Sequence, residues 1–247
     1  MKNFRRFLFL SVFFIPTLGW SLTLTTILTR IRQNIRDTST VTTDNSQRYT
    51  DATLTTYVNE AQKEINTLTW AVEKSTSYVL AAGTTYYSLP TDFLAPTQVL
   101  FTDASSTTII LAPVTEQIVY QVSPNFEQSS TGSPFQYFTR FPGSGTALQI
   151  AYIPIPTTTS TGTVKVSYNY QPADLSAGSD IPFDGFVHLY PYHESIVVRV
   201  SAMIMTLEGR DDRASAFMQT FANYIAEMED KNMAKPNYLP SARGAPR

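Results

Sequence analysis

The sequence predicts an α+β fold in which N-terminal and C-terminal helices form a helical layer and an antiparallel β-rich middle is inserted between them. Near both ends of the chain, apolar residues recur at three- and four-residue spacing, which is the period of an amphipathic helix. Between these ends the apolar runs are short and alternate with polar residues. Charged residues make up only 15% of the 247 residues, which favours exposed polar sheet faces over long solvated helices.

Composition limits the kinds of protein that the chain encodes. A hydrophobic fraction of 43% is enough for a buried core. The net charge of -2 gives no general attraction for nucleic acid. The chain contains no cysteine, which excludes disulfides, thiolate metal sites and cysteine nucleophiles. We divide the chain into a signal-like or hydrophobic arm (1–21), N-terminal helices (22–76), a β-rich middle (77–182), C-terminal helices (183–234) and an extended basic tail (235–247).

The first segment has the order of a secretory signal peptide. Three basic residues, the last of them Arg6, precede an apolar run from Phe7 to Ile15, and Pro16 interrupts the pattern before the small residue Ser21. The run is too short to span a membrane as a helix, which takes roughly 20 residues. Three interpretations stay open at this point: an export signal, a hydrophobic arm that packs on a partner subunit, and an upstream extension from a misplaced start codon.

Two amphipathic helices follow this segment. Isoleucine and leucine at three- and four-residue spacing predict the first helix over Thr23–Arg36. The polar composition of Asp37–Arg48 is typical of a loop. Thr50 or Asp51 caps the second predicted helix, which runs to about Trp70.

The β-rich middle opens with a predicted hairpin. The runs Tyr78–Leu80 and Tyr86–Leu89 flank a turn that contains Gly83, the arrangement of two antiparallel strands joined by a short connection. Pro90 then interrupts the pattern, because proline lacks a backbone N–H and restricts the residue before it. A third apolar run, Gln98–Phe101, predicts another strand.

The centre of the chain mixes strands with loops. Ile109–Leu111 is a predicted strand, and Thr115 starts a short predicted helix that runs through Tyr120. Loops dominate Ser123–Gly145, where Gly, Pro and Ser are dense, and Phe135–Thr139 is a candidate strand within it.

Two further runs alternate apolar with polar residues. Leu148–Ile153 and Val164–Tyr170 predict a pair of antiparallel strands around a turn at Thr157–Gly162. Pro154 and Pro156 should end the first of these strands or place it at a sheet edge.

The C-terminal section predicts two helices and a tail. Phe186–Leu207 is apolar nearly all round, which predicts a helix buried on several sides. Glu208 and Gly209 end it, and Asp211 caps a last amphipathic helix that runs to about Asn232. The remainder is rich in proline and basic residues and has no apolar periodicity.

The sequence contains no pattern of an enzyme or a metal protein. It has no nucleophile elbow, Walker loop or dinucleotide-binding glycine motif. His188 and His193 are five residues apart, whereas a zinc helix of the HExxH kind places its histidines four apart, so we expect both near the start of a buried helix. Asp92, Asp180 and Asp184 lie in loops, where carboxylates commonly form caps and turns. We predict no catalytic, cofactor-binding or metal site.

The ordered set of motifs resembles the bacteriophage head-to-tail adaptor (connector) family of short-tailed phages, over Leu22 to Lys231. The motifs are Ile27–Arg32 followed by Asp37-Thr38, Thr50–Leu54 leading into Tyr57–Ile65, Tyr87–Leu94 with its Leu-Pro-Thr-Asp-Phe-Leu end, Leu148–Pro156 before Val166–Tyr168, and Asp180–Pro182 ahead of the long apolar helix.

The resemblance implies a structural virion protein that assembles in the host cytoplasm. Such a protein forms a twelvefold ring under the portal, extends the DNA channel, and provides the platform for tail or gatekeeper proteins. It needs no cofactor and no small-molecule substrate, and DNA only passes through it without specific binding. A near-neutral chain suits that passage, because tight phosphate binding would impede sliding.

The resemblance also implies that the C-terminal segment reaches along the portal. The expected portal-binding residues are Lys235, Asn237, Tyr238, Leu239, Arg243 and Arg247. The departure from the family is segment 1–21, because an adaptor needs no export signal. The alternative function is an exported bacterial β-rich binding module with a cleaved signal peptide.

Overall fold

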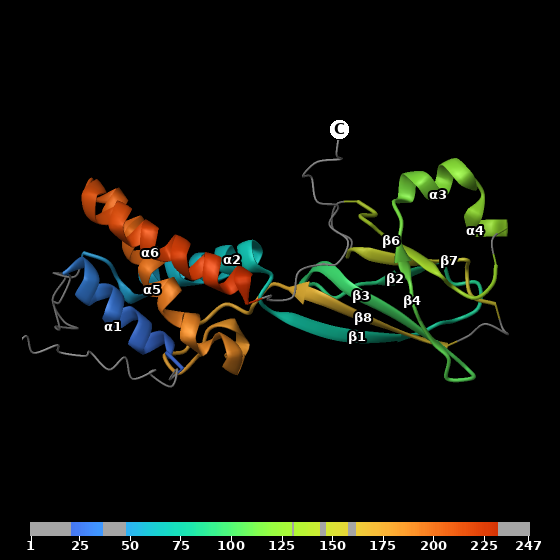
Figure 1. Ribbon diagram of the computed structural model, residues 1–247, viewed down its shortest axis with the longest axis horizontal. Helices are drawn as coiled ribbons and strands as arrows, with labels where there is room; N and C mark the ends of the chain where they lie inside the picture. The colour runs from blue at the N-terminus through green and yellow to red at the C-terminus, as the bar shows by residue number, and fades with distance from the viewer. Residues whose placement is uncertain (1–20, 37–47, 130, 144–146, 158–161, 232–247) are drawn as a thin grey trace, which may run out of the picture.

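The computed structural model describes residues 21–36, 48–129, 131–143, 147–157 and 162–231. Long helices gather at one end of the molecule, and the strands with two short helices form the other end (Figure 1). This arrangement confirms the predicted α+β class. The helices are α1 (Leu24–Ile35), α2 (Asp51–Thr69), α3 (Glu116–Val122), α4 (Phe126–Ser129), α5 (His193–Leu207) and α6 (Asp211–Asp230), with the 3₁₀ helices η1 (Phe183–Gly185) and η2 (Val187–Tyr192).

The strands form two sheets of four. Sheet A has the order β1 (Glu73–Val79), β8 (Gly162–Tyr170), β3 (Phe93–Asp103), β4 (Thr108–Ile110). Sheet B has the order β2 (Tyr86–Ser88), β7 (Gln149–Ile153), β6 (Gln136–Arg140), β5 (Ala112–Pro113). All neighbours in sheet A are antiparallel, and in sheet B only the pair of β5 and β6 is parallel.

The predicted hairpin around Gly83 is wrong in its pairing. The turn is present, and Gly83 has a φ of 73°, which glycine adopts without a steric penalty. However, β1 pairs with β8 in sheet A, and β2 pairs with β7 in sheet B. The segment between them crosses from one sheet to the other, because each strand finds its partner far away in the sequence.

The predicted pair of strands around 157–162 is wrong for the same reason. β7 ends at Ile153 as Pro154 requires, but β7 lies in sheet B and β8 lies in sheet A. The two crossing connections are bonded to each other, since Gly83 N–H donates to the Pro156 carbonyl over 2.9 Å. Gly162 fits this crowded point because a β-carbon there would lie 2.2 Å from the Thr102 carbonyl oxygen.

The two sheets and two short helices stack in three layers. Between the sheets, the Tyr87 ring lies 5.4 Å from the Tyr152 ring and 5.9 Å from the Tyr78 ring, measured between centroids. On the other face of sheet B, α3 and α4 cover a smaller core in which Phe126 packs edge-on against Phe138. Sheet B is therefore covered on both faces.

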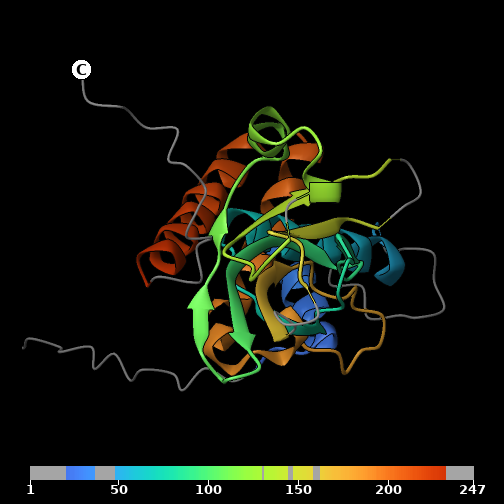
Figure 2. The same ribbon diagram turned by 90° about the vertical axis from the view of Figure 1, so that its right-hand side faces the viewer.

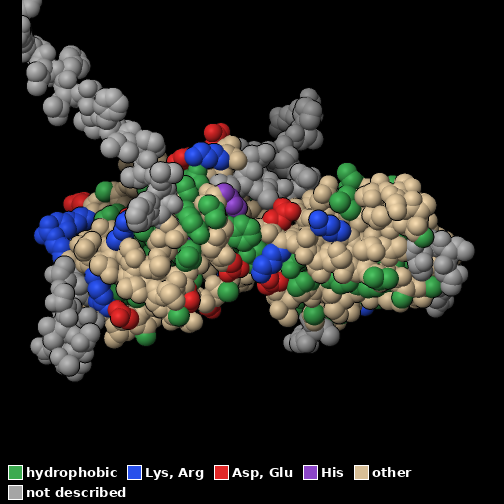
Figure 3. Space-filling view, turned by 90° about the horizontal axis from the view of Figure 1, so that it is seen from below, with side chains coloured by type: hydrophobic (Ala, Val, Ile, Leu, Met, Phe, Trp, Pro, Cys, Tyr) green, Lys and Arg blue, Asp and Glu red, His purple; other side chains and the backbone are tan. Residues whose placement is uncertain are grey.

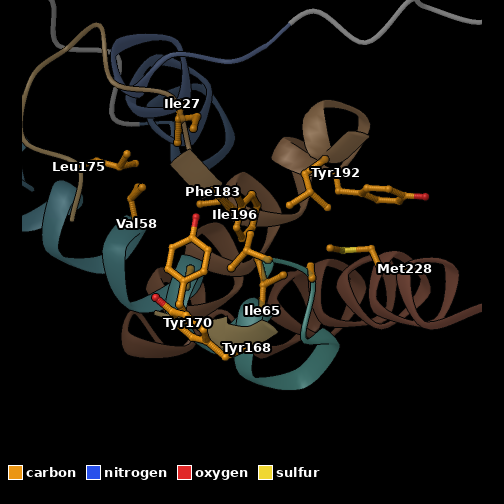
Figure 4. Packing of buried hydrophobic residues seen from close by; sticks show 14 of the residues in the cluster. Ile27, Val58, Ile65, Tyr168, Tyr170, Leu175, Phe183, Tyr192, Ile196 and Met228 are labelled. Carbon is orange, nitrogen blue, oxygen red and sulfur yellow. The ribbon is translucent and has the colours of Figure 1, made fainter. Parts of the chain in front are cut away.

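The main core continues from the sheets into the helical part. Figure 4 shows Ile65 of α2, Ile196 of α5 and Phe183 of η1 close to Tyr170 at the end of β8. A buried amide of α2 completes this junction, because Asn66 Nδ2 donates to the Tyr170 carbonyl over 2.8 Å. The helices and the strands therefore share one hydrophobic core.

The helix boundaries follow from their end residues. The Thr50 hydroxyl accepts from the Thr53 N–H over 3.2 Å, which confirms the predicted cap of α2. The long C-terminal helix begins at His193 rather than at Phe186, because the 3₁₀ helix η2 precedes it. The predicted cap at Asp211 is also wrong: the N-cap of α6 is Arg210, and Asp211 lies in the first turn.

Candidate interaction surfaces and polar clusters

A polar cluster joins the sheets to the helical part. The Lys74 ammonium lies 3.2 Å from Asp92 Oδ2, 3.8 Å from Asp184 Oδ2 and 3.6 Å from the centre of the Tyr170 ring. The phenol of Tyr170 donates to Asp184 over 2.6 Å, and that of Tyr168 donates to Asp92 over 3.3 Å. The cluster therefore brings together β1, β8, the turn that precedes β3, and η1.

The chemistry of this junction cluster is structural. Burial, together with Asp184, raises the pKa of the Tyr170 phenol above its ordinary range. Burial and the neighbouring Asp92 likewise raise the pKa of Tyr168 to about 12. Both phenols are therefore protonated donors at neutral pH, and the Lys74 ammonium lies between the two carboxylates. Asp180, the third predicted loop carboxylate, instead accepts from two backbone N–H groups in its own turn, as predicted.

A second polar cluster fixes α3 and α4 on sheet B. The hydroxyls of Tyr86 and Tyr120 both donate to the Glu127 carboxylate, the latter over 2.8 Å. These hydrogen bonds lower the pKa of Glu127. The Arg140 guanidinium stacks 3.6 Å above the Tyr86 ring and donates to Gln149 over 3.2 Å. Charge and hydrogen bonds are satisfied within the cluster, which holds the two short helices in place.

The two histidines have separate environments. His193 is fully buried at the start of α5, and its Nδ1 accepts from the Leu22 N–H over 3.1 Å. His188 lies in η2 and packs edge-on against Phe186. Glu194, which follows His193, pairs with Arg30 of α1. Within the described residues no group of three or more potential ligands could hold a metal ion.

Basic side chains of the helical part lie against carboxylates of other elements. Arg199 Nε of α5 lies 2.7 Å from Glu64 Oε2 of α2. Arg48 and Arg210 both reach Glu208 just after α5, at 2.6 Å and 3.1 Å. Such pairs orient helices more than they stabilise them, since an exposed pair contributes about 0–1 kcal/mol. The same cations are poorly placed to hold phosphate.

The outer face of sheet A is polar and nearly uncharged. Figure 3 shows charged side chains gathered on the helical part and at its junction with the sheets, and few on the sheet end. The register of the strands identifies the residues that share the outer face. Its exposed members are Ser75, Ser77, Val79, Thr108, Ile110, Thr163 and Lys165.

Sequence reasoning missed the junction cluster and the outer face of sheet A. Lys74, Asp92 and Asp184 are far apart along the chain and carry no common motif. Only the alternation of single strands pointed to the exposed face. The predicted portal-binding residues, Lys235 to Arg247, and the signal-like residues 1–20 lie outside the described residues. No helix in the described ranges is long and apolar enough to cross a membrane.

Comparison with known proteins identifies the family. The sequence profile described as SU10 adaptor protein matches residues 22–244, which include the helical part and both sheets. No curated protein matches the chain. The match confirms the resemblance drawn from the ordered motifs. The chain therefore belongs to the SU10 adaptor protein family, a family of phage head-to-tail adaptors.

Proposed function

We propose that this adaptor forms a ring between the portal and the tail of the phage particle. In that position the ring extends the DNA channel and provides the platform to which tail or gatekeeper proteins attach. The family match over residues 22–244 carries this proposal. The protein acts through its surfaces rather than through a catalytic site.

The polar clusters support a structural role. In both the junction cluster and the cluster around Glu127, donors and carboxylates satisfy one another within the molecule. An acid or base for catalysis would instead need a free path to a substrate. The paired cations of the helical part also agree with DNA that slides past without being held.

The C-terminal segment is the proposed portal contact. The residues that bind are Lys235, Asn237, Tyr238, Leu239, Arg243 and Arg247, which lack the apolar periodicity of a core element. The preceding helix supports this division, because it is anchored near its end: Met228 is buried, and Lys231 Nζ, just after the helix, lies 5.4 Å from the centre of the Tyr192 ring of η2.

The test uses purified portal rings of the same phage and recombinant protein from Leu22 onward. We expect electron micrographs to show an added ring layer on one end of each portal. A protein of the same preparation unfolded by heat is the control for non-specific deposition. Portals that stay bare would contradict the proposal. Cleavage of the full-length protein after Ser21, with recovery of the product from the periplasm, would also contradict it.

A further inference from the structure

The free edge of strand β1 is the first observation. β1 lies at one margin of sheet A (Figure 1). Leu80 N–H donates to the Gly162 carbonyl, and Tyr78 and Val164 are opposite each other in the same register. Because bonding alternates along an antiparallel pair, the even-numbered residues of β1 bond to β8. The N–H and C=O groups of Ser75, Ser77 and their odd-numbered neighbours therefore point to the open edge.

The second observation is the edge at the other side of the same sheet. β4 lies at the outer margin of sheet A (Figure 2). Leu111 N–H donates to Val99 and Asp103 N–H donates to Thr107, so the odd-numbered residues of this hairpin face β3. The backbone groups of Thr108 and Ile110 consequently face outward.

The hairpin that carries β4 is held in shape before any partner arrives. Asp103 Oδ1 accepts from the N–H groups of Ser105 and Thr107 over 2.9 Å and 2.8 Å. Thr102 and Thr108 join their hydroxyls across the two strands over 2.9 Å. A strand edge fixed in this way loses little conformational entropy on binding.

Neither edge strand contains a proline, and the one feature that limits strand pairing is the three-residue length of β4. Edge strands are commonly protected by proline, by a bulge or by an inward lysine. β1 has no proline, and its one lysine, Lys74, is turned into the junction cluster. Val79 on β1 and Ile110 on β4 are 79% and 69% exposed. Both are apolar side chains at the rims of one sheet.

The strand directions show which occupant fits. β1 and β3 run one way and β8 and β4 run the other way. If the ring axis runs along the strands, each strand keeps the same direction in every copy of the ring. β1 of one copy is then antiparallel to β4 of the next copy. The residues whose backbone groups point to the open edges, on β1 and on β4, have their side chains on the same outer face of sheet A. Directly opposite residues of an antiparallel pair likewise share one face. The two edges differ, so their contact is heterologous and generates a ring rather than a two-fold dimer.

We propose that sheet A continues from copy to copy in the ring, with β1 of one copy adding antiparallel to β4 of its neighbour. The backbone groups of Ser75, Ser77 and Val79 bond to those of Thr108 and Ile110 across the contact. Val79 and Ile110 lie on the same face of the joined sheet, where their apolar side chains shield the contact between the two copies from water. This inference rests on the proposed ring function and specifies the surface that builds the ring.

The first experiment removes one edge donor. Ser77→Pro deletes an N–H that faces the open edge and leaves the hydrogen bonds between β1 and β8 in place. We expect the association constant between neighbouring copies on the portal to fall about tenfold or more, the loss of at least one hydrogen bond at each contact. The matched control, Ser77→Ala, keeps the N–H and should assemble as the unmodified chain does. Full assembly of Ser77→Pro would overturn the proposal.

The second experiment does not depend on how well the proline variant folds. The natural chain has no cysteine, so the introduced thiols meet no other thiol of the adaptor itself. Thr108→Cys is combined in turn with Ser75→Cys, Ser77→Cys or Val79→Cys, because opposite residues in such a pair come within disulfide reach. Under oxidation on portal rings, we expect one double variant to form a ladder of covalent multimers.

The single-cysteine variants distinguish the alternatives. In the heterologous ring, each of them stays monomeric under oxidation. Dimers of Ser77→Cys or Val79→Cys alone would indicate β1 pairing with β1 and would overturn the proposal. Rings that form on the portal while all three double variants stay uncrosslinked would overturn the sheet contact but not the ring function. Portals without any added ring would instead overturn the proposed function itself.

Discussion

His193 shows how one buried side chain makes the fold sensitive to acid. It accepts the Leu22 N–H through Nδ1, and its Nε2 is buried without a partner in the described structure. The rings of Tyr190 and Phe183 lie beside it. Burial lowers the pKa of His193 to about 4, because the charged imidazole would lose its hydration.

The pH dependence of stability follows from that direction. Between pH 6.5 and 4 the unfolded chain binds a proton at this position that the folded chain excludes. The free energy of unfolding should therefore decrease as the pH is lowered from 6.5 to 4. This residue contributes up to about 1.4 kcal/mol of that decrease per pH unit. His193→Asn keeps an acceptor for Leu22 but cannot titrate. Urea unfolding of both proteins from pH 7.5 to 4.5 should give a steeper loss for the natural chain, and parallel curves would contradict the assignment.

Residue patterns predict local contacts and miss distant ones. The cap at Thr50 and the turn at Gly83 depend on neighbours in the sequence, so they could be predicted. The contact of Asp92 and Asp184 with Lys74 could not, because only the pairing of β1, β3 and β8 brings them together. For the same reason, loop positions could be predicted for Asp92, Asp180 and Asp184, whereas the contacts of Asp92 and Asp184 with Lys74 could not.

At the scale of elements, the strands could be located but not paired. β1, β2, β7 and β8 all overlap predicted strands. Alternation of apolar and polar residues reports that a strand has a buried face, and it does not report which strand lies beside it. A short connection favours a hairpin, but here both short connections cross between sheets, because sheet A and sheet B each bury one face on the other.

The turn at Gly83 tests the crossing connection. A β-carbon at this position meets no atom within 4 Å, so any loss of stability comes from the positive φ alone. Gly83→Val should lower the free energy of unfolding by about 1–2 kcal/mol. Gly83→Asn is the control, because asparagine tolerates the left-handed region and should cost less. Chemical denaturation compares the two, and an equal loss for both would show that backbone strain is not the cause.

At the scale of the whole molecule, the portal contact should separate from the fold. We predict that deletion of Asn237–Arg247 leaves the far-UV circular dichroism and the unfolding midpoint unchanged, because α6 is already held by buried Met228 and by the contact of Lys231 with the Tyr192 ring. Docking to portal rings, measured by co-sedimentation, should be abolished. The control chain carries residues 237–247 in scrambled order, which keeps the length of the tail and changes its sequence. It should also fail to dock if the portal recognises the tail sequence. Equal docking by the truncated chain would exclude the tail from the interface.

The way the chain enters and leaves the sheets has a consequence for modularity. Glu73 and Asn169 lie opposite each other in the β1–β8 pair, and Asn169 Nδ2 donates to the carbonyls of Trp70 and Val72. The whole strand-rich part is thus one excursion whose two ends are neighbours. An excursion with adjacent ends can be lengthened, shortened or exchanged without changing the path of the remaining chain. The path of the helical part therefore does not depend on the length of the strand-rich part.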